Sequence, residues 1–311
     1  TSALHAALAS LDIKPGDEVI VPTLSYISSA NVILYCGAKP IFCDSNPKTF
    51  NVTSKEIIKK ITKKTKAIIT VDLKGQPVDY DEIYSKLKKF NIPIISDSAE
   101  SFGAEYKNKK VGSQFLIHSF SFFANKNITM GEGGLIATNN DKIANKCKII
   151  RNQGQDYRYH HVTIGNNYRP TDYSAAIGSV QLKKIDKILK AKKKIVSVYN
   201  QSFKKYNSII TPYVPDFATR PSWYMYSLTF KNNKIRNKVK KSMEKNNIDT
   251  RLSFPPIHLQ PIYKKKFSLK SGMFPKSENA YKTFLDIPIY LGMTKTDISR
   301  VVNCIIESIN E

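Results

Sequence analysis

The first half of the chain alternates short apolar segments with segments of helical periodicity. The apolar segments are rich in Ile, Val and Phe, have the length of strands and lie at 18–22, 40–43, 67–73, 93–95, 117–123 and 135–138. The segments with apolar residues at helical spacing lie at 2–11, 28–35, 55–61 and 80–90. Strands that alternate with helices predict a mostly parallel sheet with helices on both faces, and therefore an α/β protein.

The second half begins with a long helical pattern at 172–206. A proline-marked segment at 211–221 then indicates the joint to a second unit. Beyond it we expect a strand, a lysine-rich helix, a loop rich in Pro and aromatic residues, and a last helix from residue 296. The sequence therefore predicts a large domain at 1–206 and a smaller C-terminal α+β domain at 207–311.

Length and composition favour a soluble globular protein. With 311 residues, 41% of them hydrophobic, the chain has enough apolar material for a sizeable core. Lys, Asp or Asn interrupts every apolar stretch before it reaches the roughly 18 residues that a membrane helix needs. The four cysteines lack the spacing of metal ligands, so we expect reduced thiols, no metal site and a cytoplasmic location.

The chain is strongly basic, with 49 Lys and Arg against 25 Asp and Glu and a formal charge of +24. Such an excess is compatible with a nucleic-acid partner. Only seven of the basic residues are arginine, however, whereas base and phosphate recognition relies on the bidentate guanidinium. Many lysines fall in 55–66, 183–194 and 231–245, where apolar residues recur at helical spacing. We therefore favour basic outer faces of surface helices over a specific nucleic-acid site.

One lysine, Lys126, follows an apolar strand and precedes a glycine-dense turn. Burying an ammonium group is costly unless it is neutralised, paired or used covalently. A lysine whose charge is suppressed is a nucleophile that forms imines with carbonyl compounds. An exposed hairpin lysine is the alternative, but Gly131, Gly133 and Gly134 indicate close approach of the backbone to a ligand.

A second polar residue, Asp97, closes a buried strand. Sheets of α/β proteins bind ligands at the carboxyl ends of their strands, although an Asp there is equally typical of a helix cap. Together with Lys126, Asp97 suggests pyridoxal phosphate, because the lysine binds this cofactor as an imine and the carboxylate keeps its ring nitrogen protonated. The protonated ring is an electron sink.

Motifs along nearly the whole chain occur in the order of one known family. They are TSALH at 1–5, PGDEVIVP at 15–22, DSAE at 97–100, FSFFANK at 120–126, GEGG at 131–134, GNNYR at 165–169, AAIG at 175–178 and TRLSFPPIHLQP at 250–261. The sequence resembles the DegT/DnrJ/EryC/StrS sugar-nucleotide aminotransferases, which are fold type I pyridoxal phosphate enzymes. The resemblance implies an aspartate aminotransferase-like fold, and the surroundings of Lys126 look most like the perosamine synthase branch.

The resemblance also implies roles for individual residues at the cofactor. Lys126 is the catalytic lysine that binds pyridoxal phosphate and moves a proton between the amino acid and the cofactor. Asp97 pairs with the ring nitrogen, Tyr26 stacks on the ring, and Glu100 stands near the phenolic oxygen. A core position is the alternative for Tyr26. The implied phosphate ligands are Thr1, Ser2, Ser121 and, from a second subunit, Asn167.

Four residues occupy positions that the family uses for the sugar nucleotide: His161, Arg169, Arg251 and His258. Both arginines can equally serve as structural ion-pair partners. The implied reaction transfers an amino group from L-glutamate, which becomes 2-oxoglutarate, to C4 of a nucleotide-linked 4-keto-6-deoxyhexose. Because Asn167 is implied to reach the site of another copy, we expect a homodimer with shared active sites.

Three alternatives to this function stay open. One is the amination of a 3-keto sugar by the same family chemistry. Another is a basic nucleic-acid-binding or regulatory protein that retains the fold. The chain also opens where the family has a few dozen residues more, so we expect the N-terminal part of the large domain to be missing. A truncated, inactive chain is therefore the third alternative.

Overall fold

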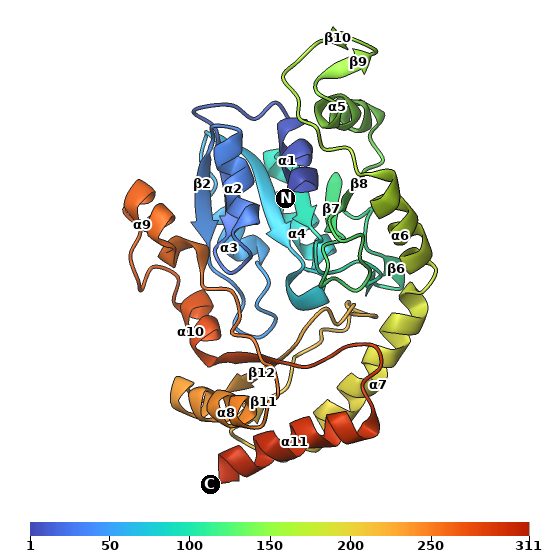
Figure 1. Cartoon of the computed structure of the whole chain (residues 1–311). Helices are drawn as coiled ribbons and strands as arrows, with labels where there is room; N and C mark the ends of the chain where they lie inside the picture. Colours follow the sequence, from blue (N-terminus) through green and yellow to red (C-terminus); the bar gives the residue numbers. More distant parts are fainter. Residues whose placement is uncertain (311) are drawn as a thin grey trace.

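A six-stranded sheet forms the centre of the larger part of the molecule (Figure 1). In this computed structural model, which describes residues 1–310, the strand order is β2-β1-β3-β4-β7-β8. The strands are β1 (Glu18–Pro22), β2 (Lys39–Cys43), β3 (Thr65–Val71), β4 (Ile94–Asp97), β7 (Ile117–Ser121) and β8 (Gly134–Ala137). All run parallel except β8, which is antiparallel to β7, and this confirms the predicted α/β fold with a mostly parallel sheet.

Helices cover both faces of this sheet, because successive strand residues point to opposite sides. Val19 and Val21 of β1 pack into the core on one face, whereas Ile20 packs into the core on the other. The side chains of Asp79 and Asn140 cap the N-termini of α4 and α5. The helices on the first face are α1 (Ser2–Ala9), α2 (Ser28–Tyr35) and α5 (Asp141–Arg151), and those on the second are α3 (Ser54–Ile58) and α4 (Tyr80–Leu87).

A three-stranded antiparallel sheet, in the order β11-β12-β13, forms the centre of the C-terminal part. Its elements are β11 (Ile209–Ile210), β12 (Tyr226–Phe230), β13 (Phe284–Ile287), α8 (Asn233–Lys245) and α11 (Lys295–Asn310). Val239 and Met243 of α8 are fully buried in the core of this sheet, four residues apart, as the apolar spacing predicts. The arrangement confirms a smaller α+β unit at the C-terminal end.

The helical pattern at 172–206 forms two helices, α6 (Asp172–Leu182) and α7 (Ile185–Phe203). α7 runs between the two parts of the molecule (Figure 1). Ile188 of α7 packs into the core of the large sheet, and Tyr199 packs into the core of the small one. One helix therefore belongs to both cores.

Two helices of the C-terminal part return to the large sheet. They are α9 (Pro261–Phe267) and α10 (Pro275–Thr283). Tyr263 of α9 and Phe274, just before α10, pack edge-on against Phe42 of β2. Both α7 and α9 therefore contribute to the core of the large sheet as well as to the C-terminal part. The predicted domain boundary between residues 206 and 207 stays a proposal. Two hairpins complete the fold, β5 (Glu105–Tyr106) with β6 (Lys109–Lys110), and β9 (Gln155–Tyr157) with β10 (His160–His161).

The four cysteines are free thiols, and Cys43, Cys147 and Cys304 are buried. In the part of the chain that the structure describes, no helix combines the length and the apolar character needed to cross a membrane. Among the same residues, no group of three or more His, Cys, Asp and Glu side chains is arranged to hold a metal ion.

Candidate active site

A cavity of about 360 Å³ lies at the carboxyl ends of β3, β4 and β7, where α/β sheets bind their ligands. Its walls also include the start of α2 and, from the C-terminal part, Tyr224 and Phe254. Seven predicted site residues line this cavity: Thr1, Tyr26, Asp97, Glu100, Ser121, Lys126 and Arg251. The structure therefore brings together residues that lie far apart in the sequence.

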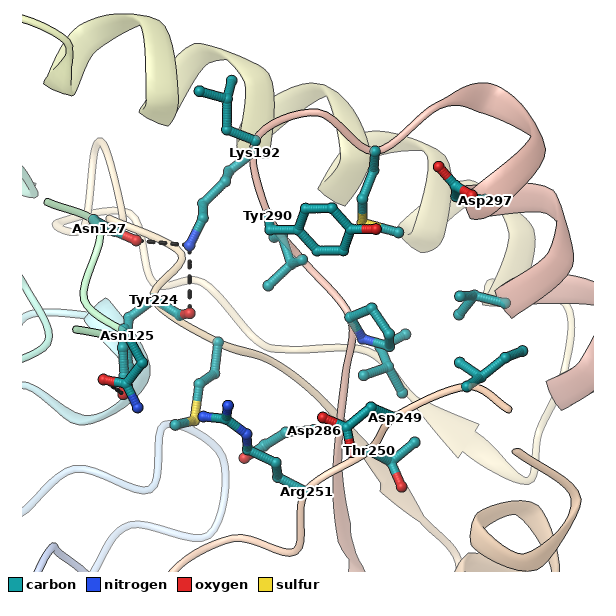
Figure 2. A pocket seen from close by; sticks show the side chains of 18 of the residues that line it. Asn125, Asn127, Lys192, Tyr224, Asp249, Thr250, Arg251, Asp286, Tyr290 and Asp297 are labelled. Atoms are coloured by element: carbon teal, nitrogen blue, oxygen red, sulfur yellow. Dashed lines mark hydrogen bonds between the residues drawn. The ribbon is translucent and has the colours of Figure 1, made fainter. Parts of the chain in front are cut away.

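A second cavity, of about 600 Å³, shares part of its wall with the first. Lys126, Tyr224, Arg251 and Asp286 line both cavities. From this wall the second cavity extends towards α7 and α11, and Figure 2 shows the side chains around it. Lys126 thus lies where two hollows meet.

Lys126 lies in the turn that follows β7, and it is half-buried. The backbone N–H of Lys126 donates to the Phe123 carbonyl over 3.0 Å. The Lys126 ammonium lies 4.1 Å from the centre of the Tyr224 ring, a cation–π distance. The Tyr224 hydroxyl in turn donates to Oδ1 of Asn125 over 3.0 Å, so the aromatic ring and the turn support each other.

Asp97 ends β4 and is buried. Its Oδ2 accepts a hydrogen bond of 2.7 Å from the Ser29 hydroxyl, and its Oδ1 accepts one of 3.3 Å from the Ala99 amide. Among residues 1–310, no lysine, arginine or histidine forms a salt bridge with this carboxylate. This buried carboxylate at the cavity wall can accept further hydrogen bonds. It therefore suits a ligand that carries a positively charged N–H group.

Glu100 lies beside Asp97 in the same wall and is also buried. Burial raises the pKa of Glu100, an effect that the charge of Lys126 opposes and the charge of Asp97 reinforces. The backbone N–H of Lys74 donates to Oε2 of Glu100 over 2.5 Å. Glu100 therefore has a fixed orientation and a tendency to hold its proton.

Lys74 and Asp286 also belong to the site, although the sequence does not predict them. The Lys74 side chain is 13% exposed, and its ammonium lies 3.2 Å from Asp286 and 2.5 Å from the Ser227 hydroxyl. It also lies 3.6 Å from the centre of the Phe284 ring. Burial lowers the pKa of Lys74, whereas Asp286 and Glu100 act in the opposite direction. This ion pair joins the loop after β3 to β13 at the edge of both cavities.

Hydroxyl groups gather at the start of α1. Thr1 and Ser28, each at the start of a helix, form a hydrogen bond of 2.7 Å between their side chains and line the cavity together with Ser121. Free backbone N–H groups and hydroxyls at a helix N-terminus favour an anion such as phosphate. Ser2 is exposed in the first turn of α1 and does not line the cavity.

Tyr26 provides a flat wall of the cavity and is 57% exposed, so it is not a core residue. Its ring centre lies 5.4 Å from that of Phe254. Arg251 is exposed, lines both cavities, and pairs through its backbone with Asp286. The arginine side chain is therefore accessible from the cavity.

Four further predicted residues do not reach this cavity within one chain. His161 hydrogen-bonds to the Gln153 carbonyl, Arg169 to the Asn152 side chain, and Asn167 pairs through its backbone with Asn152. These three residues lie beyond α5 in the exposed region around β9 and β10, at one edge of the molecule (Figure 1). The fourth residue is His258.

His258 is fully buried rather than part of the cavity wall. Its Nδ1 lies 2.7 Å from the Thr23 hydroxyl and its Nε2 lies 3.1 Å from Oε1 of Glu278. Glu278 also accepts hydrogen bonds from the segment that precedes α10. His258 therefore anchors the segment between β12 and β13 to the large sheet.

The residues around the cavity fit pyridoxal phosphate. The Lys126 amine suits the aldehyde, and the buried Asp97 carboxylate suits the ring nitrogen. Tyr26 provides a wall for the ring face, and the hydroxyls at the start of α1 suit the phosphate. Together with the fold, they define a fold type I aminotransferase. A sequence model of the DegT/DnrJ/EryC1/StrS aminotransferase family matches residues 1–306, and the chain belongs to this family.

Known proteins place the chain among sugar aminotransferases. It is 40% identical over 306 residues to the GDP-perosamine synthase of Caulobacter vibrioides, covering 97% of this chain and 82% of that protein. It is 32% identical over 292 residues to the UDP-2-acetamido-2-deoxy-3-oxo-D-glucuronate aminotransferase of Pseudomonas aeruginosa, covering 93% and 79%. The solved PLP form of a putative sugar aminotransferase from Streptococcus pneumoniae superposes with a TM-score of 0.92 at 28% identity, covering 99% of this chain and 85% of that one. The protein is a pyridoxal phosphate-dependent sugar aminotransferase.

Proposed function

We propose that this enzyme transfers an amino group from L-glutamate to C4 of a nucleotide-linked 4-keto-6-deoxyhexose. The observation that carries the proposal is the convergence of Lys126, Asp97 and Tyr26 on one cavity, in a chain similar to a GDP-perosamine synthase. Glutamate becomes 2-oxoglutarate, and the keto oxygen of the sugar is replaced by the amino group.

The side chains of the cavity suit both half-reactions. Bound pyridoxal phosphate supplies an electron sink that stabilises negative charge on the carbon that loses a proton. The Lys126 amine would hold the cofactor covalently until the amino group of the donor takes its place. The freed amine would then accept that proton from the amino acid and return it at the other end of the transfer. The Asp97 carboxylate, held by Ser29 and Ala99, accepts the hydrogen bond of the protonated ring nitrogen.

Glu100 acts as a neutral acid next to the cofactor ring. Burial raises the pKa of this carboxyl group, which favours the protonated form. A protonated Glu100 donates a hydrogen bond to the phenolic oxygen, whereas an ionised one would repel it. The Lys74 N–H holds the other carboxyl oxygen in place.

The phosphate binds at the start of α1, with the hydroxyls of Thr1 and Ser121 and the backbone N–H of Ser2 as donors. Asn167 lies away from the cavity of its own chain, and we assign it to the cavity of a second copy in a homodimer. The exposed apolar side chains of α6 support an interface between copies, since such side chains rarely cluster on the free surface of a monomer.

The sugar nucleotide binds to residues from both copies. Arg251 at the cavity wall belongs to the same chain as the cofactor lysine, and its guanidinium suits a pyrophosphate. His161 and Arg169 contribute from the second copy, on the same segment as Asn167. His258 is buried and takes no direct part in binding.

Product analysis tests the proposal. The protein is loaded with pyridoxal phosphate and incubated with L-glutamate and nucleotide-linked 3-keto or 4-keto sugars. We expect NMR to locate the new amine at C4, and Lys126→Ala to abolish both product and the near-visible absorbance of the bound cofactor. Lys110→Ala, on the exposed β6, is the matched control. Product formation by Lys126→Ala would contradict the proposal.

A 3-keto sugar is the second candidate substrate. The similarity to the 3-oxo-D-glucuronate aminotransferase of Pseudomonas aeruginosa favours it. The same incubations distinguish the two candidates, because an amine found only at C3 would replace the first proposal by the second.

A further inference from the structure

A second lysine, Lys192, is buried close to Lys126 and has no part in the chemistry described above. It lies on α7, is 6% exposed, and borders the larger cavity. Its ammonium donates to Oδ1 of Asn127 over 2.6 Å, to the Trp223 carbonyl over 3.0 Å and to the Tyr224 carbonyl over 3.4 Å. Figure 2 shows Lys192 reaching from α7 towards Asn127 and the segment of Tyr224.

These contacts match the three N–H donors of an ammonium group with three neutral oxygen acceptors. Among residues 1–310, no carboxylate forms a salt bridge with Lys192. Burial lowers the pKa of Lys192 to about 8, so the charge is costly at this position. The hydrogen bonds to the two segments offset this cost.

The two segments that Lys192 holds are the ones that surround Lys126. Asn127 is the next residue after Lys126, and its amide group also donates to the Ser222 carbonyl over 2.7 Å. Tyr224 presents its ring to the Lys126 ammonium and its hydroxyl to Asn125. Lys192 thus connects the turn of Lys126 to the irregular segment before β12 that faces it.

The backbone of this facing segment needs such support. Trp223 has a φ of 49°, in the left-handed region that a bulky residue rarely adopts. A residue in this conformation is strained and persists only where its surroundings hold it. The hydrogen bond from Lys192 to the Trp223 carbonyl is one of the contacts that do so.

We propose that Lys192 is a positioning residue that orients Lys126 for its reaction with the cofactor, through Asn127 on one side and Tyr224 on the other. The inference rests on the proposed role of Lys126. Without Lys192, the turn and the Tyr224 ring lose their common support, and the Lys126 amine samples orientations that do not face the cofactor. A displacement of about 1 Å at such a site costs up to roughly a hundredfold in rate.

The test compares Lys192→Met with Lys192→Arg, which keeps a charged donor at the same place. Lys193→Met, at the exposed neighbouring position on α7, is the matched control. The first readout is the rate at which Lys126 acquires pyridoxal phosphate, measured by borohydride reduction and peptide mass analysis. The others are kcat and KM for the amino donor, and the thermal unfolding of the cofactor-free protein.

We expect Lys192→Met to slow the attachment about tenfold or more and to lower kcat by a similar factor with little change in KM. Lys192→Arg should restore most of the rate, and Lys193→Met should behave as the native protein. If Lys192→Met does not fold, Asn127→Ala removes one of the three contacts and should slow attachment by a smaller factor.

Two results would overturn the inference. One is an attachment rate in Lys192→Met, or in Asn127→Ala, equal to that of the native protein. The other is a loss of thermal stability alone, with attachment and kcat unchanged. If borohydride still attached the cofactor to Lys126→Ala, through a residue other than 126, the proposed function would fail instead. The two failures are therefore distinguishable.

Discussion

His118 shows how one buried residue acquires a defined protonation state. It lies on β7, fully buried, and its Nε2 accepts a hydrogen bond of 3.1 Å from the Phe115 amide. The proton of the neutral ring is therefore on Nδ1, which lies 3.0 Å from the Ser98 hydroxyl. Ser98 in turn donates to Asp72 over 2.8 Å. Burial lowers the pKa of His118 to about 4, so the ring stays neutral.

This state predicts a loss of stability in acid. The pKa of His118 in the folded protein, about 4, lies below its ordinary value of 6.5. The unfolded chain therefore binds the proton more readily, and the contribution of His118 is lost as the pH falls from 6.5 towards 4. We expect this loss to approach about 3 kcal/mol. Urea unfolding of the cofactor-free protein at several pH values measures it.

His118→Gln, which cannot titrate, should show a shallower pH dependence of the unfolding free energy over this interval. His161→Gln, on an exposed segment, is the matched control and should leave the slope nearly unchanged. An equal slope in His118→Gln and the native protein would contradict this assignment.

At the scale of the secondary-structure element, α6 is unusual because none of its residues is buried. Tyr173, Ile177, Val180 and Leu182 are apolar and exposed. In a surface helix of a monomer, the apolar residues face the core and the polar ones face solvent. The apolar residues of α6 face no core of their own chain. An interface with a second copy explains this composition.

Ile177→Asp should therefore convert the proposed dimer into monomers, because a charge would be buried at the interface without a partner. Light scattering during gel filtration measures the change in mass, and cofactor affinity should fall with it if Asn167 serves the other copy. Lys187→Asp, at an exposed position of α7, is the control. A native protein that elutes as a monomer would contradict the proposal at once.

Periodicity predicts the elements that have strong apolar patterns. The predicted strand at 18–22 and the helix at 28–35 have the same bounds as β1 and α2. α5, α10 and β13 were not predicted. Charged and polar residues interrupt the apolar ones in α5 and α10, and β13 has only four residues, one of them the charged Asp286. Tertiary contacts stabilise these elements, so a local pattern does not identify them.

At the scale of the whole molecule, the pair of Lys74 and Asp286 joins the two sheets. Removing one partner leaves a buried charge without compensation, which typically costs about 3 kcal/mol. We expect Lys74→Met to lower the unfolding free energy by about this amount, and Lys74→Met/Asp286→Leu to recover part of it. Urea unfolding of the cofactor-free protein measures both.

The exposed pair of Lys107 and Asp81 provides the control for this ion pair. Lys107→Met should change stability little, because solvent screens the charges. The unfolding free energy lost in Lys74→Met/Asp286→Leu is compared with the losses in Lys74→Met and Asp286→Leu. If it equals their sum, Lys74 and Asp286 do not stabilise each other.

The candidate site was predictable where a motif marks it. Lys126 follows a strand and precedes several glycines, and Asp97 ends a strand, so sequence position alone singles them out. Lys74 has a similar position, because it also follows a strand and precedes a glycine. Lys192, in contrast, lies within a lysine-rich helix and has no such mark in the sequence. Only the packing of α7 against the segment of Trp223 distinguishes Lys192 from its exposed neighbours.

Trp223 is the single tryptophan of the chain. It belongs to the segment that faces Lys126, and its carbonyl accepts a hydrogen bond from Lys192. The residue is 8% exposed, so its surroundings are protein rather than water. The tryptophan fluorescence of this protein therefore has one source, close to the lysine that binds the cofactor. Emission excited selectively at the indole reports on the active-site turn without any introduced label, and a cofactor that absorbs in the range of that emission quenches it by energy transfer.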